Sequence, residues 1–206
     1  MVQRGDRPLL QRETIVAAAR ELIREGGLEA LSLRRLAERL GVTAPALYAH
    51  VRDKTDLLRA VAEGEFASLV AVYREVENRE PLDRMRAHAR AYIAVARDEP
   101  EMFRVMVLFP PELGPADVPD DAELPAATAA FALAAGAVEE AAASGAVATD
   151  DVVLTTLTFF AAAHGVATVL GLGFGLPPEF EDQMVDEMLD RLIAGYRTPV
   201  AGRGPL

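Results

Sequence analysis

The chain has 206 residues, which is enough for one large domain or two small ones with a buried core. Apolar residues make up 51% and charged residues 26%, a composition typical of globular rather than disordered proteins. There is no cysteine, which excludes a disulfide framework, a thiolate metal site and a cysteine nucleophile. No apolar leader segment follows Met1, so we expect a cytoplasmic protein.

Charge is distributed unevenly along the chain, although the net charge is −11. Residues 1–56 carry ten Lys and Arg against eight Asp and Glu, whereas residues 57–206 carry eleven against twenty-four. A mildly basic first part joined to a strongly acidic second part indicates a nucleic-acid-binding end.

Apolar residues recur at helical spacing throughout, and no segment alternates over the length of a strand. This pattern predicts an all-α fold with about nine helices. In the first part the expected helices lie at 10–25, 33–40, 44–50 and from 53, where Asp53 caps a long helix, to the late seventies. In the second part they lie at about 83–97, 100–108, an alanine-rich stretch ending near 144, 150–172 and 178–195, with a proline-rich loop at 110–121.

The predicted helix at 150–172 contains no charged residue after Asp151, and the uncharged run between Asp151 and Glu179 is long enough to span a bilayer. Both flanks are acidic, and no Lys or Arg is present to orient a membrane span. The run also contains threonines, His164 and four glycines. We therefore favour a helix buried all round, in a core or a subunit interface, and expect no membrane.

The segment from Ser32 to His50 predicts two short helices joined by only Gly41, Val42 and Thr43. Ser32 and Thr43 are placed to cap them, and Gly41 supplies the left-handed residue that ends the first helix. So short a connection forces a steep crossing, which lets one helix brace on phosphates while the other enters the major groove. An ordinary corner of a helical bundle is the alternative interpretation. Basic residues around both helices favour DNA binding.

The run from Leu31 to Leu58, LSLRRLAERLGVTAPALYAHVRDKTDLL, resembles the DNA-binding signature of the TetR (tetracycline-repressor-like) family of bacterial transcriptional regulators. The resemblance covers about residues 12–62 and includes the Leu-Ala-x-x-Leu-Gly-Val core and the Leu-Tyr-x-His motif. Residues 160–167, FAAAHGVA, resemble the Trp/Phe…His-Gly motif of one class of TetR C-terminal domains, with Phe160 where Trp is usual. The resemblance implies a helix-turn-helix DNA-binding domain at 1–56 and a ligand-binding and dimerisation domain at 57–206.

Carried over to this sequence, the resemblance implies two sets of DNA contacts. The residues assigned to phosphate oxygens are Ser32, Tyr48, His50 and Lys54. The residues assigned to bases are Arg34, with Arg35 as a further candidate, and Thr43, Ala44, Pro45 and Ala46. Because alanine and proline can only touch thymine methyl groups or allow close approach, hydrogen-bond readout rests mainly on Arg34 and Thr43. Core packing of Tyr48 and plain solvation of His50 and Lys54 are the alternatives.

The second part predicts dimerisation, because an uncharged helix followed by a Met-rich amphipathic one has more apolar surface than a small monomer can bury. Two such helices from each subunit would form a four-helix bundle, and a two-fold dimer predicts a palindromic double-stranded operator. The expected interface residues are Leu157, Phe160, Val169, Met184, Met188 and Leu192.

Larger side chains on the middle helices are the candidates for a ligand pocket, although each alone also fits a core. They are Phe66, Tyr73, Met85, His88, Tyr92, Phe103, Met106, Phe109, Phe131, Phe160 and His164. They predict a small apolar or aromatic effector, with no metal and no cofactor, because nothing has metal-ligand spacing. A helical-bundle enzyme or carrier is the alternative, but the three histidines lie on separate elements and no nucleophile–base motif is present. A regulator that needs no ligand, or an activator, also stays open beside the expected ligand-responsive repressor.

Overall fold

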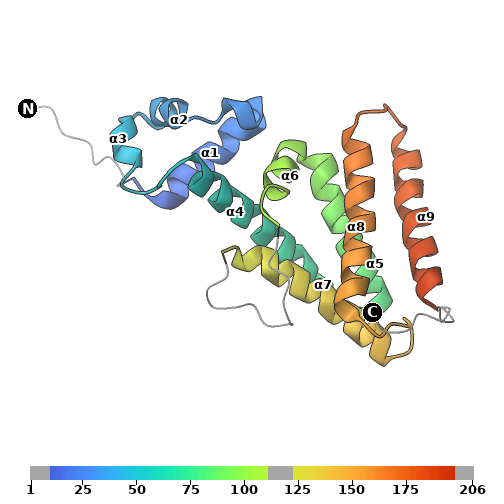
Figure 1. Cartoon of the computed structure of the whole chain (residues 1–206). Coiled ribbons are helices and arrows are strands. Elements are labelled where there is room, and N and C mark those ends of the chain that lie inside the picture. The colour runs from blue at the N-terminus through green and yellow to red at the C-terminus, as the bar shows by residue number, and fades with distance from the viewer. Residues whose placement is uncertain (1–9, 111–122, 198–206) are drawn as a thin grey trace, which may run out of the picture. The chain divides into compact units, whose positions relative to one another are not determined.

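A computed structural model of the chain describes residues 10–110 and 123–197, and every regular element within these ranges is helical (Figure 1). Nine α-helices and one 3-10 turn are present there, which confirms the predicted all-α class. The chain divides into two compact units after Ala62, within helix α4 (Lys54–Glu75). The predicted division after residue 56 lies earlier on the same helix.

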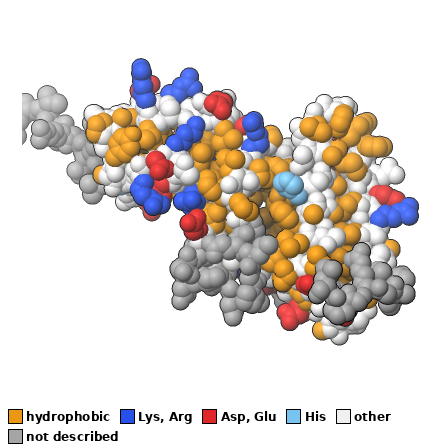
Figure 2. All heavy atoms as spheres, in the orientation of Figure 1, with side chains coloured by type: hydrophobic (Ala, Val, Ile, Leu, Met, Phe, Trp, Pro, Cys, Tyr) orange, Lys and Arg blue, Asp and Glu red, His pale blue; other side chains and the backbone are white. Residues whose placement is uncertain are grey.

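The N-terminal unit contains α1 (Arg12–Gly26), the turn η1 (Leu28–Ala30), α2 (Leu33–Leu40), α3 (Ala44–Leu47) and the start of α4. Helix α1 packs against α2, and α2 packs against α3. Its core consists of fully buried side chains, namely Ile15, Ala19, Ile23, Leu36, Leu47 and Leu57. Figure 2 shows lysine and arginine side chains spread over the surface of this unit. The polar residues of the motif are therefore carried on a rigid apolar frame.

Helix α3 is shorter than predicted, because it ends at Leu47 and not near His50. The chain tightens there into a turn, in which the N–H groups of His50 and Val51 both donate to the Leu47 carbonyl, at 2.9 and 3.0 Å. The His50 carbonyl then accepts a hydrogen bond from Arg12 Nη1 at 2.6 Å instead of continuing the helix. A long-range contact thus ends the helix, which local spacing did not reveal.

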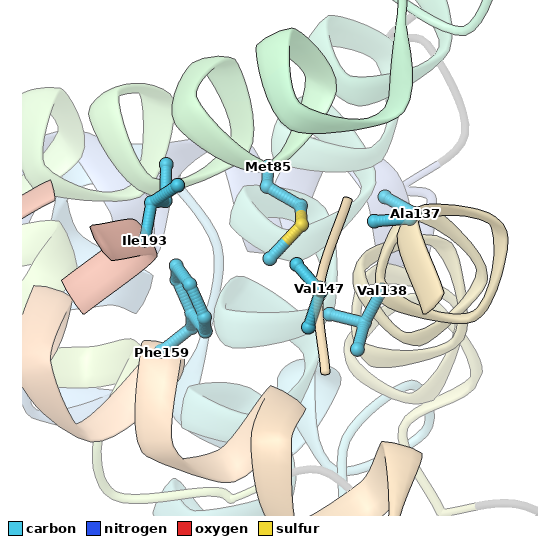
Figure 3. Close-up of a cluster of buried hydrophobic side chains, with 7 residues drawn as sticks. Met85, Ala137, Val138, Val147, Phe159 and Ile193 are labelled. Atoms are coloured by element: carbon cyan, nitrogen blue, oxygen red, sulfur yellow. The ribbon is translucent and has the colours of Figure 1, made fainter. Parts of the chain in front are cut away.

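The C-terminal unit contains the rest of α4 with α5 (Pro81–Asp98), α6 (Pro100–Met106), α7 (Pro125–Ala143), α8 (Val152–Gly171) and α9 (Pro178–Arg197). Helix α5 packs against α6, α7 and α8, and α8 also packs against α7 and α9. Prolines begin α5, α6 and α7, where the missing N–H costs no helical hydrogen bond. Figure 3 shows one cluster where four helices meet, formed by Met85, Ala137, Val138, Ala141, Val147, Phe159 and Ile193.

Ion pairs connect α5 to α9 along their length. Arg86, Arg90 and Arg97 pair with Asp190, Asp186 and Asp182, with N–O distances of 2.7, 2.5 and 3.2 Å. The opposite order of the two sets shows that the helices run antiparallel. Such exposed pairs contribute little stability, so their main effect is to set the register of α9 against α5.

Helices α7 and α8 are long and apolar enough to cross a membrane by length and composition alone. In the apolar stretch of α8 only 28% of residues are buried within the single chain. Leu154, Phe160, Val169 and Leu172 are exposed, so the expectation of burial all round is wrong for one isolated subunit. The alternative in that expectation, a subunit interface, stays a prediction.

Candidate functional site

The helix-turn-helix segment is fixed by one side-chain cap and one left-handed glycine. Ser32 Oγ accepts a hydrogen bond from the Arg35 N–H at 3.2 Å at the start of α2, as predicted. Gly41 ends α2 with φ 65°, and the Val42 N–H donates to the Ala37 carbonyl at 3.0 Å. A side chain at position 41 would be strained in this conformation.

Thr43 precedes α3 but does not cap it with its side chain, contrary to the prediction. Pro45 has no N–H to donate, and the Ala46 N–H donates to the Thr43 backbone carbonyl at 2.9 Å. The hydroxyl therefore stays at the exposed surface, beside the exposed ring of Pro45.

The predicted DNA contacts fall into exposed and half-buried positions. Arg34, Arg35, Thr43, Pro45, Tyr48 and Lys54 are exposed, and Ser32, Ala44, Ala46 and His50 are half-buried. Tyr48 is 58% exposed, which excludes the core-packing alternative for this residue. Arg34 Nε donates to Glu38 Oε1 at 3.0 Å, and Lys54 Nζ donates to the Leu28 carbonyl at 3.3 Å.

A buried carboxylate holds this surface together. Asp56 accepts two hydrogen bonds from the Arg12 guanidinium, at 2.9 and 3.1 Å, and one from the Arg52 N–H at 2.9 Å. The Arg12 guanidinium, helped by the Arg52 N–H, lowers the pKa of Asp56 to about 2 against the effect of burial. Arg12 also holds the His50 carbonyl. One ion pair therefore connects α1, the turn after α3 and the start of α4.

The C-terminal unit contains a partly open cavity of about 270 Å³ that is lined by α4, α5, the end of α6 and the segment after it, α7 and α8. Ten of the predicted pocket residues line it, and Phe103 does not. Phe103 lies behind the lining, with its ring edge-on to Tyr92 at 5.4 Å between centroids. Glu63 Oε1 on α4 accepts a hydrogen bond from the Ala126 N–H at 2.9 Å, which ties α7 to α4 beside the cavity.

The sequence did not predict nine residues of the lining. Four are alanines, namely Ala127, Ala130, Ala134 and Ala163, and the others are Val107, Pro110, Val138, Thr156 and Phe159. The one available signal was the alanine-rich composition of α7, because short side chains facing large ones leave space between helices.

Few polar groups face the cavity, and none of its described lining residues is charged. Tyr92 Oη and His164 Nδ1 hydrogen-bond to each other at 3.0 Å. His88 is 4% exposed, and neither of its ring nitrogens has a hydrogen-bond partner. Burial lowers the pKa of His88 to about 4 and raises the pKa of Tyr73 and Tyr92, so all three side chains are neutral at physiological pH.

A second, polar cavity of about 250 Å³ shares His88 with the first. Its wall carries Arg74, Glu77, Arg84 and Glu140. Arg84 Nη2 lies 2.5 Å from Glu140 Oε2, and Arg84 Nη1 donates to the Glu77 carbonyl at 3.3 Å. Among the described residues no group of three His, Asp or Glu side chains is arranged to hold a metal ion.

The predicted interface residues lie on α8 and α9 with unequal exposure. Phe160 and Val169 are 39% and 37% exposed, and Leu157, Met184, Met188 and Leu192 are half-buried. Leu192 packs against the hydrophobic cluster of its own subunit. Phe160 also lines the cavity.

Comparison with known proteins gives matches in both units. Residues 15–61 match "Bacterial regulatory proteins, tetR family", and residues 85–192 match "Tetracyclin repressor-like, C-terminal domain". The class C tetracycline repressor protein of Escherichia coli is 56% identical over 54 residues, which are 26% of this chain and 25% of that protein. The chain thus matches only about a quarter of the length of this curated relative.

Solved structures match over nearly the whole chain. A protein of unknown function from Rhodococcus sp. RHA1 has a TM-score of 0.75 at 30% identity, covering 95% of this chain and all of that one. A TetR variant from Acinetobacter baumannii AYE in complex with minocycline has a TM-score of 0.68 at 24% identity, covering 91% and 96%. With a C-terminal family match that extends over more than half of the residues, the chain belongs to the tetR family of bacterial regulatory proteins.

Proposed function

We propose that this protein is a dimeric transcriptional repressor of the cytoplasm, which binds a palindromic DNA operator and leaves it when a small uncharged molecule enters the cavity. The observation that carries this proposal is the pairing of two features on one chain. A helix-turn-helix with an exposed polar surface precedes an apolar cavity, and α4 contributes to both units. Regulation, not catalysis, is the role that such a pair supports.

In the proposed complex the exposed groups of Tyr48 and Lys54 hold phosphates, together with the half-buried His50 and Ser32. Arg34 reads a base edge after exchanging its exposed pair with Glu38, which costs little because both side chains are solvated. The free hydroxyl of Thr43 is the second hydrogen-bonding group available to bases.

Dimerisation through α8 and α9 is supported by the exposed apolar side chains of α8. Ala161 and Gly165 are exposed on the same helix, and a Cβ added at Gly165 would meet nothing within 4 Å in its own subunit. The Phe160…His164-Gly165 motif supports assignment to the Trp/Phe…His-Gly class of C-terminal domains. In that assignment His164 holds Tyr92, and Gly165 admits a helix of the partner subunit.

The proposed switch uses α4, an unbroken helix of 22 residues. It begins at Lys54, beside the proposed phosphate contacts, and its Phe66, Leu69 and Tyr73 line the cavity. A ligand that binds one orientation of α4 more tightly than the operator-binding orientation lowers operator affinity by the difference between its two binding free energies. Such coupling free energies are typically about 1–3 kcal/mol. The TetR variant from Acinetobacter baumannii AYE was solved in complex with minocycline.

Fluorescence anisotropy with DNA from upstream of the protein's own gene tests the DNA-binding part. We expect saturable binding of one or more dimers, with Tyr48→Phe weakening it about two- to tenfold through loss of one hydrogen bond. Tyr196→Phe removes a hydroxyl from α9 and is the matched control, which we expect to bind like wild type. A protein that binds no segment of this DNA above its affinity for random sequence would contradict the proposal.

A further inference from the structure

The polar groups of the apolar cavity differ in whether they already have partners. Thr156 Oγ1 donates to the Val152 carbonyl at 2.7 Å, and Tyr92 and His164 hydrogen-bond to each other. His88 lies in the same lining, more than nine-tenths buried; the Tyr73 backbone is near enough to interact with its ring, but neither ring nitrogen has a partner at good hydrogen-bond geometry. Buried polar atoms without partners are uncommon in folded proteins, and those that persist call for a functional or structural reason.

The position of the His88 ring is set by its neighbour. Its plane stacks on the Tyr73 ring, with 4.0 Å between centroids and 18° between planes. Burial lowers the pKa of His88; the Tyr73 backbone opposes this shift, and the positive charge of Arg84 adds to it. The imidazole is therefore a neutral group with one N–H donor and one nitrogen acceptor, held in place inside an apolar cavity.

The cavity also limits the size and charge of what it can hold. Its volume of about 270 Å³ is nearly twice that of the roughly 150 Å³ apolar cavity that binds benzene. Its described lining contains no arginine, lysine, aspartate or glutamate to compensate an ionised group, and burial of an uncompensated charge is strongly unfavourable. A molecule of about two rings without a charge fits both limits.

We propose that His88 is the ligand-anchoring residue of this cavity, and that the effector is an uncharged, largely aromatic molecule of about two-ring size whose hydroxyl or carbonyl group hydrogen-bonds to the His88 imidazole. The proposal rests on the proposed function only in taking the cavity as the effector site.

Three probes with one carbon skeleton test the proposal by calorimetric titration of the full-length protein without DNA. They are 2-naphthol, which carries an uncharged hydroxyl, 2-methylnaphthalene, which replaces it by a methyl of similar size, and 2-naphthoate, which is an anion. We expect 2-naphthol to bind about tenfold or more tightly than 2-methylnaphthalene, because only the hydroxyl pairs with a buried orphan group. We expect 2-naphthoate to bind most weakly.

Two variants separate anchoring from structural support. His88→Phe keeps a ring against Tyr73 but removes both nitrogens, so the preference for 2-naphthol over 2-methylnaphthalene should disappear. Its melting temperature should stay equal to wild type or rise, because the change removes two unpaired buried polar atoms. His88→Gln keeps a donor and an acceptor and should restore part of the preference. A melting temperature that falls in both variants while the probe preference persists would assign His88 a structural role and overturn the proposal.

The remaining outcomes distinguish this proposal from the proposed function. Equal binding of 2-naphthol and 2-methylnaphthalene to wild type, or tightest binding of 2-naphthoate, overturns the role of His88 and leaves a ligand-binding cavity. Binding of none of the three probes overturns the assigned ligand class. Operator affinity, measured by fluorescence anisotropy with each probe at saturation, then tests the switch separately. If no bound probe changes this affinity, the result counts against ligand-responsive repression but not against the role of His88.

Discussion

The ion pair between Arg12 and the buried carboxylate of Asp56 makes the stability of the N-terminal unit depend on pH. Asp56 has a pKa of about 2 in the folded protein, against an ordinary value of 3.8. A carboxylate with a lowered folded pKa stabilises the fold above its unfolded pKa, and the contribution is lost as pH falls through the folded pKa. The change in pKa corresponds to about 2 kcal/mol at pH 7, of which about half remains at pH 3.

Asp56→Asn removes this contribution while keeping an oxygen that can accept the hydrogen bond from the Arg52 N–H. Arg12 loses its counterion, but its side chain is 41% exposed and stays hydrated, so this adds little cost. We therefore expect the free energy of unfolding to fall by about 2 kcal/mol at pH 7, and the difference from wild type to shrink steadily between pH 5 and pH 3.

Urea denaturation followed by circular dichroism at pH 7, 5, 4 and 3 measures this difference. Hydrogen exchange read by mass spectrometry locates it, and we expect faster exchange in α1 and in residues 48–56 but not in α5–α9. Glu38→Gln breaks the exposed pair with Arg34 and is the matched control, with an expected cost below about 0.5 kcal/mol. A cost for Asp56→Asn as small as that of the control, or one that is constant from pH 7 to pH 3, would refute the reasoning.

Three further predictions concern DNA, assembly and the cavity. Lys54→Ala should weaken binding to all DNA sequences alike and lower the magnitude of the slope of log affinity against log salt by about one; an unchanged slope would remove Lys54 from the interface. Arg34→Ala, by contrast, should reduce the preference for one base pair per half-site by roughly 1–3 kcal/mol. Ala161→Glu on the exposed face of α8 should give a folded monomer in sedimentation while Ala71→Glu on α4 leaves a dimer, and a dimeric Ala161→Glu protein would place the interface elsewhere. Ala89→Trp should fill the cavity and abolish binding of 2-naphthol, and unchanged binding would show that the probe binds at another place.

Local signals were sufficient for most helices of this protein. The glycines and prolines at helix ends act through backbone geometry alone, so Gly41 and the prolines that begin α5, α6 and α7 could be read without knowledge of tertiary contacts. The cap by Ser32 is equally local. Thr43 shows the limit, because its capping role depended on N–H groups that Pro45 and a backbone hydrogen bond removed.

Residue type and spacing also predicted most of the large side chains that line the cavity, although not Phe159, because bulky aromatic residues on the inner faces of several helices have to meet. Phe103 was wrongly assigned to the lining, because side-chain size alone does not distinguish a residue that lines a cavity from one that packs behind the lining. The alanine wall of α7 was missed because a small residue gives no signal of its own; its effect is the space that it leaves between neighbours.

By itself, the sequence determined the helical class, the position of most helix ends and the presence of a helix-turn-helix before an apolar body, because these follow from periodicity and backbone preferences over a few residues. Only the tertiary structure decided where α3 ends, that Arg12 and Asp56 pair across 44 positions of sequence, and that His88 lies buried without a hydrogen-bond partner. Each of these depends on which distant side chains become neighbours when the core packs. The desolvation cost of a buried polar group and the stabilisation by its partner are both set only when the helices meet.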